Sequence, residues 1–409
     1  MRRVVITGLG AVTPVGNNVP QMWENLKTGV NGIAAITQFD ASQMKVRIAG
    51  EVKNLQPELF LSPQEVRRLD RTAILALIAA QEAYQDSQLE KAVIDPYRFG
   101  VYVTSGIGGV NTLYQEIGKA VLKGGDRVSP FFVTNVIVNL IPGQISIKYQ
   151  AKGPSLAVVT ACASSTNAIG EAFRAIRDGY MDIAFTGGAE SPINEIGVGG
   201  FSSMRALNTS NDPDNASIPF DKRRSGFVIG EGAGVLILEE YEHAVKRGAK
   251  IYAEIVGYSS TSDAYHITAP DETAEAITVC MKQALRDARL EKEKIDYINP
   301  HGTSTVYNDK LETKAIYNVF GDYTKNILMS ATKSMTGHTM GAIGAMEAII
   351  CAKTVQEDTI VPMINYREFD PECDLNFVLD RPMHKQVKYA LSNNLGFGGH
   401  NATIIIKKI

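Results

Sequence analysis

The chain has 409 residues, of which 44% are hydrophobic and 21% are charged, and its formal net charge is -3 at pH 7. A single hydrophobic core stops growing at roughly 250–300 residues, so this length predicts two domains or a duplicated architecture. The slightly acidic balance argues against a broad nucleic-acid-binding surface, which needs many Lys and Arg contacts to phosphates.

The cysteine spacing and the first residues of the chain indicate the cellular compartment that we expect for the protein. Four cysteines, at positions 162, 280, 351 and 373, show no C-x-x-C spacing, which predicts a reducing, cytoplasmic setting. The first residues, MRRVVITGLGAVTPVG, begin like a signal peptide, but glycines and Pro14 interrupt the apolar run. We expect a first β-strand that ends in a glycine turn. No run of about 18 apolar residues occurs, so we expect no membrane span.

Short apolar runs alternate with helical patterns in both halves, which is typical of an α/β fold. In the first half we expect strands at 4–9, 100–105, 156–160, 182–188 and 234–240, with helices at 74–85, after Cys162 and at 239–250. In the second half we expect strands at 250–260, 295–298 and 327–334, helices at 274–288 and 340–352, and a strand pair over 389–409. The sequence therefore predicts a domain at 1–250 and a second domain at 251–409.

Cys162 stands between an apolar run and a helical pattern. The run Leu156 to Thr160 predicts a buried strand, and the apolar residues that follow recur at helical spacing, at Ile169, Ala172, Phe173 and Ile176. A thiol at a helix N-terminus faces unpaired N–H groups that favour the thiolate. A free cysteine is also often a small buried hydrophobe, and this segment alone leaves both interpretations open.

Two histidines lie in glycine- and threonine-rich segments. His301 follows the strand at 295–298 in NPHGTST, before a helix that Asn308 or Asp309 would cap. His338 precedes the helix Met340 to Ala352, which is apolar almost all round and should be central. Glu347 is the only charge of that helix, so it must find a partner or stay protonated. The glycine-rich segments at 8–13, 106–111 and 230–235 lack the last glycine of a dinucleotide-binding motif, and no zinc-protease motif occurs.

Four motifs taken together carry a family resemblance: TACAS at 160–164, NPHGTST at 299–305, KSMTGH at 333–338 and NNLGFGGHN at 393–401. They resemble the β-ketoacyl-acyl-carrier-protein synthases through essentially the whole chain. The segments SGIGG at 105–109, GVGGFSSMRAL at 197–207 and DAYHITAP at 263–270 resemble most the elongating condensing enzymes of bacterial type II fatty acid synthesis. The resemblance implies the thiolase fold, with two α/β halves in a five-layered αβαβα sandwich.

The resemblance also implies a decarboxylative condensation of acyl- and malonyl-carrier protein to 3-oxoacyl-carrier protein. Cys162 would carry the acyl group, and His301 and His338 would donate from Nε2 to the developing oxyanion. The backbone N–H groups of Cys162 and Phe397 would hold a second oxyanion. Lys333 would pair with Glu347, so that each offsets the cost of burying the other.

Further residues take their expected roles from the same resemblance. Thr303 and Thr305 would bind the pantetheine arm, Phe397 would gate the cysteine, and the flexible turn at Gly398 and Gly399 would contact substrate. Ile107 and Phe201 would line the acyl tunnel. A basic patch for an acidic carrier protein would consist of Arg67, Arg68, Arg71, Lys123, Arg127 and Arg205.

The resemblance implies a homodimer, with residues 130–140 as a candidate interface, and no cofactor or catalytic metal. Some relatives have a monovalent cation near the residue corresponding to Asn299, and Pro300 puts that site in doubt here. His400 follows the glycine turn and could make the position of Phe397 depend on pH.

Several other classes share features of this sequence. A type I elongating synthase or a polyketide ketosynthase would keep every catalytic residue. A degradative thiolase needs a second cysteine in the C-terminal glycine turn, where this chain has Phe397. A non-catalytic chain-length partner of polyketide systems would lack the cysteine that is present here at position 162.

Overall fold

The computed structural model describes residues 1–409 and has a nine-stranded sheet at its centre. The strands run in the spatial order β4-β5-β6-β1-β7-β13-β12-β8-β9. Their bounds are β1 Val4–Val12, β4 Phe99–Thr104, β5 Ile183–Glu190, β6 Gly232–Glu240, β7 Ala253–Ser262, β8 Tyr297–Asn299, β9 Leu328–Met329, β12 Tyr389–Gly396 and β13 His400–Lys407. Two separate two-stranded sheets pair β2 Ala34–Ala35 with β3 Ile48–Ala49, and β10 Thr359–Ile360 with β11 Met383–His384.

The two halves of this sheet repeat one pairing pattern. In the first half β4 runs parallel to β5, and β5, β6 and β1 then pair antiparallel. In the second half β8 runs parallel to β12, and β12, β13 and β7 then pair antiparallel. A short antiparallel pairing of β1 with β7, at Val4 to Ile6, joins the halves. The duplicated architecture predicted from the order of elements is confirmed.

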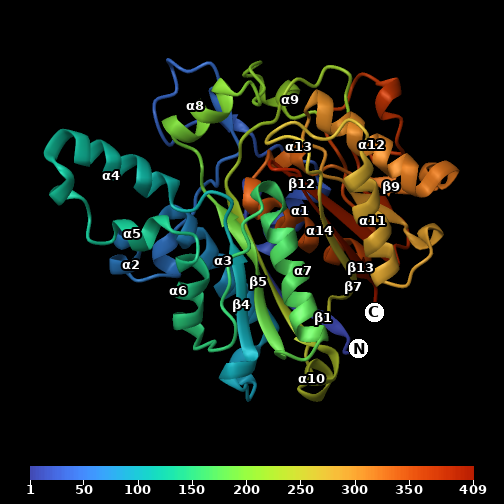
Figure 1. Cartoon of the computed structure of the whole chain (residues 1–409), viewed down its shortest axis with the longest axis horizontal. Coiled ribbons are helices and arrows are strands. Elements are labelled where there is room, and N and C mark those ends of the chain that lie inside the picture. The colour runs from blue at the N-terminus through green and yellow to red at the C-terminus, as the bar shows by residue number, and fades with distance from the viewer.

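Helices cover both faces of each half. Their bounds are α1 Val19–Lys27, α2 Pro63–Arg68, α3 Arg71–Ser87, α4 Val110–Lys123, α5 Phe132–Val136, α6 Leu140–Tyr149, α7 Ser164–Arg177, α8 Glu195–Ser203, α9 Pro213–Ala216, α10 Tyr241–Lys246, α11 Glu275–Asp287, α12 Val306–Phe320, α13 Lys333–Thr336 and α14 Ile343–Glu357. Helix α3 packs on β1 and β6, whereas α11 packs on β7 and β13 and contacts α12. Helices α7 and α14 contact each other between the two halves, which gives the five layers (Figure 1).

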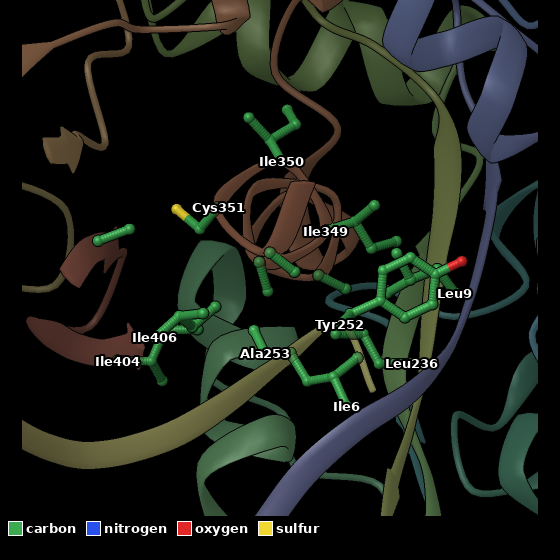
Figure 2. Close-up of a cluster of buried hydrophobic side chains, with 14 of the residues drawn as sticks. Ile6, Leu9, Leu236, Tyr252, Ala253, Ile349, Ile350, Cys351, Ile404 and Ile406 are labelled. Carbon is green, nitrogen blue, oxygen red and sulfur yellow. The ribbon is translucent and has the colours of Figure 1, made fainter. Parts of the chain in front are cut away.

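Helix α14 forms the centre of the largest apolar cluster. A tight turn at Met340–Ala342 leads into it, and apolar side chains cover it on every side. In Figure 2 the helix is seen end-on, with Ile349 on the side of Leu9 and Leu236, whereas Ile350 points away from the labelled strand residues. The expected central position of this helix is confirmed. No helix of the chain is both long and apolar enough to cross a membrane.

Strand β1 differs from its prediction because its glycines lie within it. The strand continues through Gly8 and Gly10 to Val12 instead of ending in a glycine turn. A Cβ at Gly8 would lie 2.2 Å from the Ala83 carbonyl oxygen, and one at Gly10 would lie 1.9 Å from that of Ala79. Both glycines are therefore needed for the close approach of α3, not for a turn.

The predicted buried strand at Leu156 to Thr160 is wrong. Only a single bridge, from Ser155 to Val101, ties this segment to the edge strand β4, and the following residues leave the sheet. The side chains of Leu156 and Val159 are 50% and 48% exposed. The apolar run thus lies along an outer edge, where periodicity alone cannot separate a core strand from a surface segment.

Candidate active site

Cys162 lies in the 3-10 turn Ala161–Ala163, immediately before α7. Ala161 adopts a φ of 51°, a left-handed conformation that costs free energy in a residue with a side chain. The chain therefore makes a sharp, strained entry into the helix at the residue that precedes the thiol. Cys162 is partly exposed, whereas the other three cysteines are buried, and all four are free.

The two predicted histidines meet at this thiol. His338, between α13 and α14, places Nε2 3.0 Å from the Cys162 Sγ. The ring of His301, which follows β8, lies edge-on to that of His338 with the centroids 5.3 Å apart. One ligand atom from each of the three residues lies within 4.8 Å of the other two. A cysteine and two histidines that lie 139 and 176 positions after it thus form one compact donor set.

Lys333 and Glu347 lie directly behind the histidines. The Lys333 Nζ is 2.5 Å from the Glu347 Oε1, and both side chains are almost fully buried. Lys333 also donates to the backbone carbonyl of His301. The second carboxylate oxygen of Glu347 accepts a hydrogen bond of 2.7 Å from Asn394 on β12. The family resemblance implied the ion pair, whereas Asn394 stood in the motif NNLGFGGHN without an assigned role.

Burial sets the protonation of the site. It lowers the pKa values of His301 and His338 well below 6.5, and the charge of Lys333 adds to this effect, so both rings are neutral at pH 7. Burial also raises the pKa of Cys162 to about 12, although Lys333 opposes the rise. The start of α7 acts in the opposite direction, so that the preference of this helix N-terminus for the thiolate stays a prediction. The thiol needs a proton acceptor.

The glycine turn between β12 and β13 packs on the cysteine backbone. A Cβ at Gly396 would lie 3.1 Å from the Cys162 nitrogen and 2.6 Å from the Thr160 oxygen. Gly398 and Gly399 adopt φ angles of 85° and 74°, which side chains disfavour. The turn thus brings Phe397 next to the cysteine, as the predicted second oxyanion site requires.

Aromatic side chains connect Phe397 to the histidines. The rings of Phe397 and Phe201 are 6.4 Å apart, and Phe201 contacts Phe227 edge-on at 5.6 Å. Phe227 in turn lies edge-on to His338 at 5.3 Å. Sequence analysis missed Phe227, which sits in a loop segment without a motif. A continuous row of ring contacts therefore joins Phe397 to His338.

The remaining predicted substrate contacts lie at the rim. The hydroxyls of Thr303 and Thr305 are 2.9 Å apart, with Thr303 buried and Thr305 half-buried. Ile107 is 41% exposed, so in a single chain its side chain does not line an enclosed tunnel. The predicted cap of α12 is wrong: Thr305 occupies the N-cap position, and Asp309 instead accepts from the backbone N–H of Thr303 and of Phe220.

Two buried carboxylates that the sequence analysis missed hold the loops of the site. Glu312 on α12 accepts from the backbone N–H of His301 and of Gly302 at 2.7 and 2.8 Å. Glu190, at the end of β5, accepts from Gly106, Ile107 and Gly341. A carboxylate at the end of an otherwise apolar run was the only sequence signal for Glu190. Both residues position backbone next to the Cys162 and His301 centre.

Five of the six residues of the predicted basic patch are exposed, and the sixth, Arg71, forms an internal ion pair. Arg67 and Arg68 lie on α2, Lys123 ends α4, and Arg127 and Arg205 occupy exposed turns. Arg71 instead makes a two-point contact with the buried Glu231, at 2.7 and 2.6 Å. Its charge is already neutralised within the fold, so Arg71 does not belong to the patch. Helices α2, α4 and α5 gather on one side of the molecule (Figure 1).

Comparisons with known proteins agree with this fold. Residues 1–244 match the family model "Beta-ketoacyl synthase, N-terminal domain", and residues 252–367 match "Beta-ketoacyl synthase, C-terminal domain". The chain therefore belongs to the β-ketoacyl synthase family. Within that family it is 48% identical over 407 residues to "3-oxoacyl-[acyl-carrier-protein] synthase 2" of Staphylococcus aureus (strain COL), covering 100% of this chain and 98% of the relative. A protein of the same name from Coxiella burnetii (strain RSA 493 / Nine Mile phase I) is 44% identical, covering 100% of this chain and 99% of the relative.

Solved structures show the same fold. A β-ketoacyl synthase from Burkholderia phymatum STM815 is 34% identical, with a TM-score of 0.93 and full coverage of both chains. Another similar chain comes from a structure described as a "type II PKS acyl-carrier protein in complex with its ketosynthase bound to the hexaketide". It is 33% identical with a TM-score of 0.93, and the match covers 100% of this chain and 99% of that chain. The thiolase-type fold predicted from the sequence is confirmed.

Proposed function

We propose that the protein condenses an acyl group from acyl-carrier protein with malonyl-carrier protein, yielding 3-oxoacyl-carrier protein, carbon dioxide and free carrier protein in fatty acid elongation. The observation that carries the proposal is the placement of Cys162 Sγ against His338 Nε2 with His301 beside it. The full-length similarity to proteins named 3-oxoacyl-[acyl-carrier-protein] synthase 2 supports the carrier-bound substrates and favours this pathway over a polyketide one.

The first half-reaction transfers the acyl group to Cys162. As sulfur attacks the thioester carbonyl, its proton moves to His338 Nε2, 3.0 Å away, and then to the departing thiolate of the carrier. One C–S bond forms and one breaks, and the thiol is never exposed as a free thiolate. The Nδ1 of His338 is buried without a hydrogen-bond partner, so no contact fixes the tautomer and the ring can first accept and later donate.

The second half-reaction joins the two chains. Malonyl-carrier protein loses carbon dioxide, and negative charge develops on its thioester oxygen. Neutral His301 and His338 donate to that oxygen from Nε2. The carbanion then attacks the acyl-Cys162 carbonyl, whose oxygen is held by the backbone N–H groups of Cys162 and Phe397. A C–C bond forms, the C–S bond breaks, and the leaving sulfur takes up one proton from solvent, which is the proton that decarboxylative condensation consumes. Thr303 and Thr305 hold the pantetheine arm.

The thiolase alternative lacks a structural basis in this site. A thiolase would need a second cysteine beside Cys162, where the turn here carries Phe397. Cys373 is instead fully buried in a separate apolar cluster that includes Leu311 and Leu375. The donor set at Cys162 therefore suits a decarboxylative condensation.

The acidic carrier protein docks on the exposed basic residues around the site entrance: Arg67, Arg68, Lys123, Arg127 and Arg205. Reversing Arg68 and Arg127 to Glu should weaken carrier binding and reduce its dependence on salt. Lys91→Glu, an exposed reversal outside this set, is the control. Unchanged affinity in the double variant would contradict the docking surface.

The protein acts as a homodimer in this proposal. Several exposed apolar side chains belong to neighbouring parts of the first half: Phe131, Val133, Ile137, Leu156 and Val159. A second copy of the chain would remove this surface from water. Sedimentation analysis should show a dimer, and Val133→Asp with Val159→Asp should shift it to monomer.

A monovalent cation near Asn299 remains part of the proposal. The Oδ1 of Asn299 and the Oγ of Ser392 are buried, lack hydrogen-bond partners and belong to residues paired across β8 and β12. Two unsatisfied oxygens on adjacent strands suit a hard cation. The ion would supply only structural stabilisation. The free cysteines fit the predicted cytoplasmic location, which stays a prediction.

The deciding experiment is a condensation assay with acyl- and malonyl-carrier protein over a series of acyl chain lengths. The wild type should release carbon dioxide and form an acyl-enzyme. Cys162→Ala should form no acyl-enzyme and no product, whereas Cys280→Ala, which removes a buried thiol on α11, should elongate. Elongation by Cys162→Ala would refute the proposal.

A further inference from the structure

Asn394 on β12 occupies a buried position between three partners. Thr166 on α7 donates a hydrogen bond from Oγ1 to the Asn394 Oδ1. The Asn394 Nδ2 donates to Glu347 Oε2 at 2.7 Å and lies 3.4 Å from the His301 Nδ1. Asn394 has no exposed surface. Its side chain thus connects the ion pair of Lys333 and Glu347 to one nitrogen of His301.

These contacts fix which end of the amide faces His301. The Glu347 Oε1 is taken by Lys333, so Oε2 is left to Asn394. An ionised carboxylate can only accept hydrogen bonds, which requires the amide nitrogen of Asn394 on that side. The opposite orientation would place two oxygens against each other and would leave the Thr166 hydroxyl facing an NH₂ group. The NH₂ group of Asn394 is therefore the end that lies beside His301.

The amide orientation in turn selects a tautomer of His301. A neutral imidazole carries one proton, on either Nδ1 or Nε2. A proton on Nδ1 would face the N–H of Asn394, so that two donors would meet in a water-free site. A lone pair on Nδ1 can accept that N–H, although at 3.4 Å the hydrogen bond is long. The proton is therefore favoured on Nε2, the nitrogen that faces away from Asn394.

We propose that Asn394 is a positioning residue that fixes His301 as the Nε2–H tautomer, so that this ring is a permanent hydrogen-bond donor at the reaction centre. The proposal deepens the function proposed above and rests on it for its catalytic meaning. It also distinguishes the two histidines, since no partner restrains the Nδ1 of His338. His301 is held as a donor, whereas His338 is free to exchange roles.

A second consequence concerns metal ions. Cys162, His301 and His338 bring together one sulfur and two nitrogen ligands within 4.8 Å, a donor set of the kind that binds Zn²⁺. A histidine that binds metal through Nε2 must carry its proton on Nδ1 and usually donates it to a carboxylate or carbonyl. Asn394 offers a donor at that position. The same amide that prepares His301 for catalysis therefore opposes metal capture by the open site.

The test replaces the amide with a carboxylate. In Asn394→Asp the carboxylate can accept from Nδ1–H, so the proton of His301 should move from Nε2 to Nδ1. Asn394→Leu removes the contact without offering an acceptor, and serves if the second carboxylate beside Glu347 impairs folding. Asn208→Asp is the matched control, because Asn208 is a buried asparagine whose partners are Ser210 and Ser225.

Two readouts are independent of turnover. Nitrogen NMR of histidine-labelled protein reports the tautomer of His301 directly, with His301→Asn to assign its signals. Titration with Zn²⁺ or Co²⁺ reports metal affinity, and a sulfur-to-cobalt charge-transfer band reports the Cys162 ligand. We expect Nε2–H in the wild type, Nδ1–H in Asn394→Asp, and metal binding about 10–100-fold tighter in that variant than in the wild type or Asn394→Leu.

The outcomes separate this proposal from a purely structural role and from the proposed function. Nδ1–H in the wild type, or an unchanged tautomer in Asn394→Asp, would overturn the assignment. Equal metal affinity in Asn394→Asp and Asn394→Leu would show that Asn394 only supports packing, and would also overturn it. A shifted proton with undiminished condensation would leave the tautomer assignment standing and contradict the catalytic role of His301.

Discussion

Removal of one partner of the Lys333 and Glu347 ion pair should destabilise the fold far more than removal of both. The charged atoms are 2.5 Å apart and the side chains are 1% and 0% exposed. At an effective dielectric constant of about 20 their attraction is roughly 6–7 kcal/mol, while burial costs several kcal/mol for each ion. The pair is therefore close to neutral overall, but a single unpaired charge keeps its full burial cost.

Lys333→Met should lower the free energy of unfolding by about 3–5 kcal/mol, and Lys333→Met with Glu347→Leu should lower it by much less than the sum of the single changes. Burial raises the pKa of Glu347, and loss of Lys333 removes the charge that opposes this rise. A folded pKa above the unfolded value stabilises at low pH and loses that contribution as pH rises. Lys333→Met should therefore be less stable at about pH 8 than at about pH 6.

Urea unfolding followed by circular dichroism measures all four members of this cycle. The double variant should be inactive, because Lys333 and Glu347 hold His301 and Asn394, so stability and not turnover is the readout. Additive losses, or a cost below about 1 kcal/mol for Lys333→Met, would refute the view that an unpaired buried charge dominates.

Three further predictions follow from other parts of the site. Gly396→Ala should lower kcat/KM about 100-fold and the free energy of unfolding by about 1–3 kcal/mol, because its Cβ would displace the backbone of Thr160 and Cys162; an active variant would contradict the close approach. The kcat/KM of the wild type should show no acidic limb with a midpoint near pH 6.5, because the pKa values of His301 and His338 lie well below that value; such a limb would refute their neutrality. Burial raises the pKa of Glu312 to about 7, so this group stabilises the fold below its unfolded pKa and loses that effect as pH rises through 7. The stability advantage of the wild type over Glu312→Gln should therefore shrink by about 1 kcal/mol between about pH 6 and pH 8, as measured by urea unfolding.

The sequence predicted the elements whose patterns are local. The helix that became α14 was recognisable because its residues are apolar on every face, and the hairpin of β12 and β13 because glycines interrupt two apolar runs. The segment at Leu156 to Thr160 has the same local pattern as a core strand, but its exposure depends on what lies beside it in space. Local pattern therefore predicted α14 and the β12–β13 hairpin, but it could not show that residues 156–160 lie outside the sheet and partly exposed.

In the active site, too, local motifs revealed some residues, whereas contacts between distant segments were visible only in the structure. Cys162, His301 and His338 stood in motifs, and their resemblance to a family brought them together before any geometry was known. Asn394 also stood in a motif, but its contacts, like those of Glu312 and Phe227, join distant segments, which no single stretch of sequence displays. The bidentate contact of Arg71 with Glu231, 160 positions apart, likewise could not be distinguished from a solvated surface charge.

The active site depends on the junction between the two halves of the chain. Cys162 comes from the first half and both histidines come from the second. The two halves meet closely where α7 packs on α14, because a Cβ on Gly344 would lie 2.0 Å from the Thr166 hydroxyl oxygen. Neither half contains a complete set of reacting groups, because the thiol and the two histidines come from different halves. Local opening of either half also separates the nucleophile from its histidines. Turnover in this chain is therefore a direct report that the two halves remain joined.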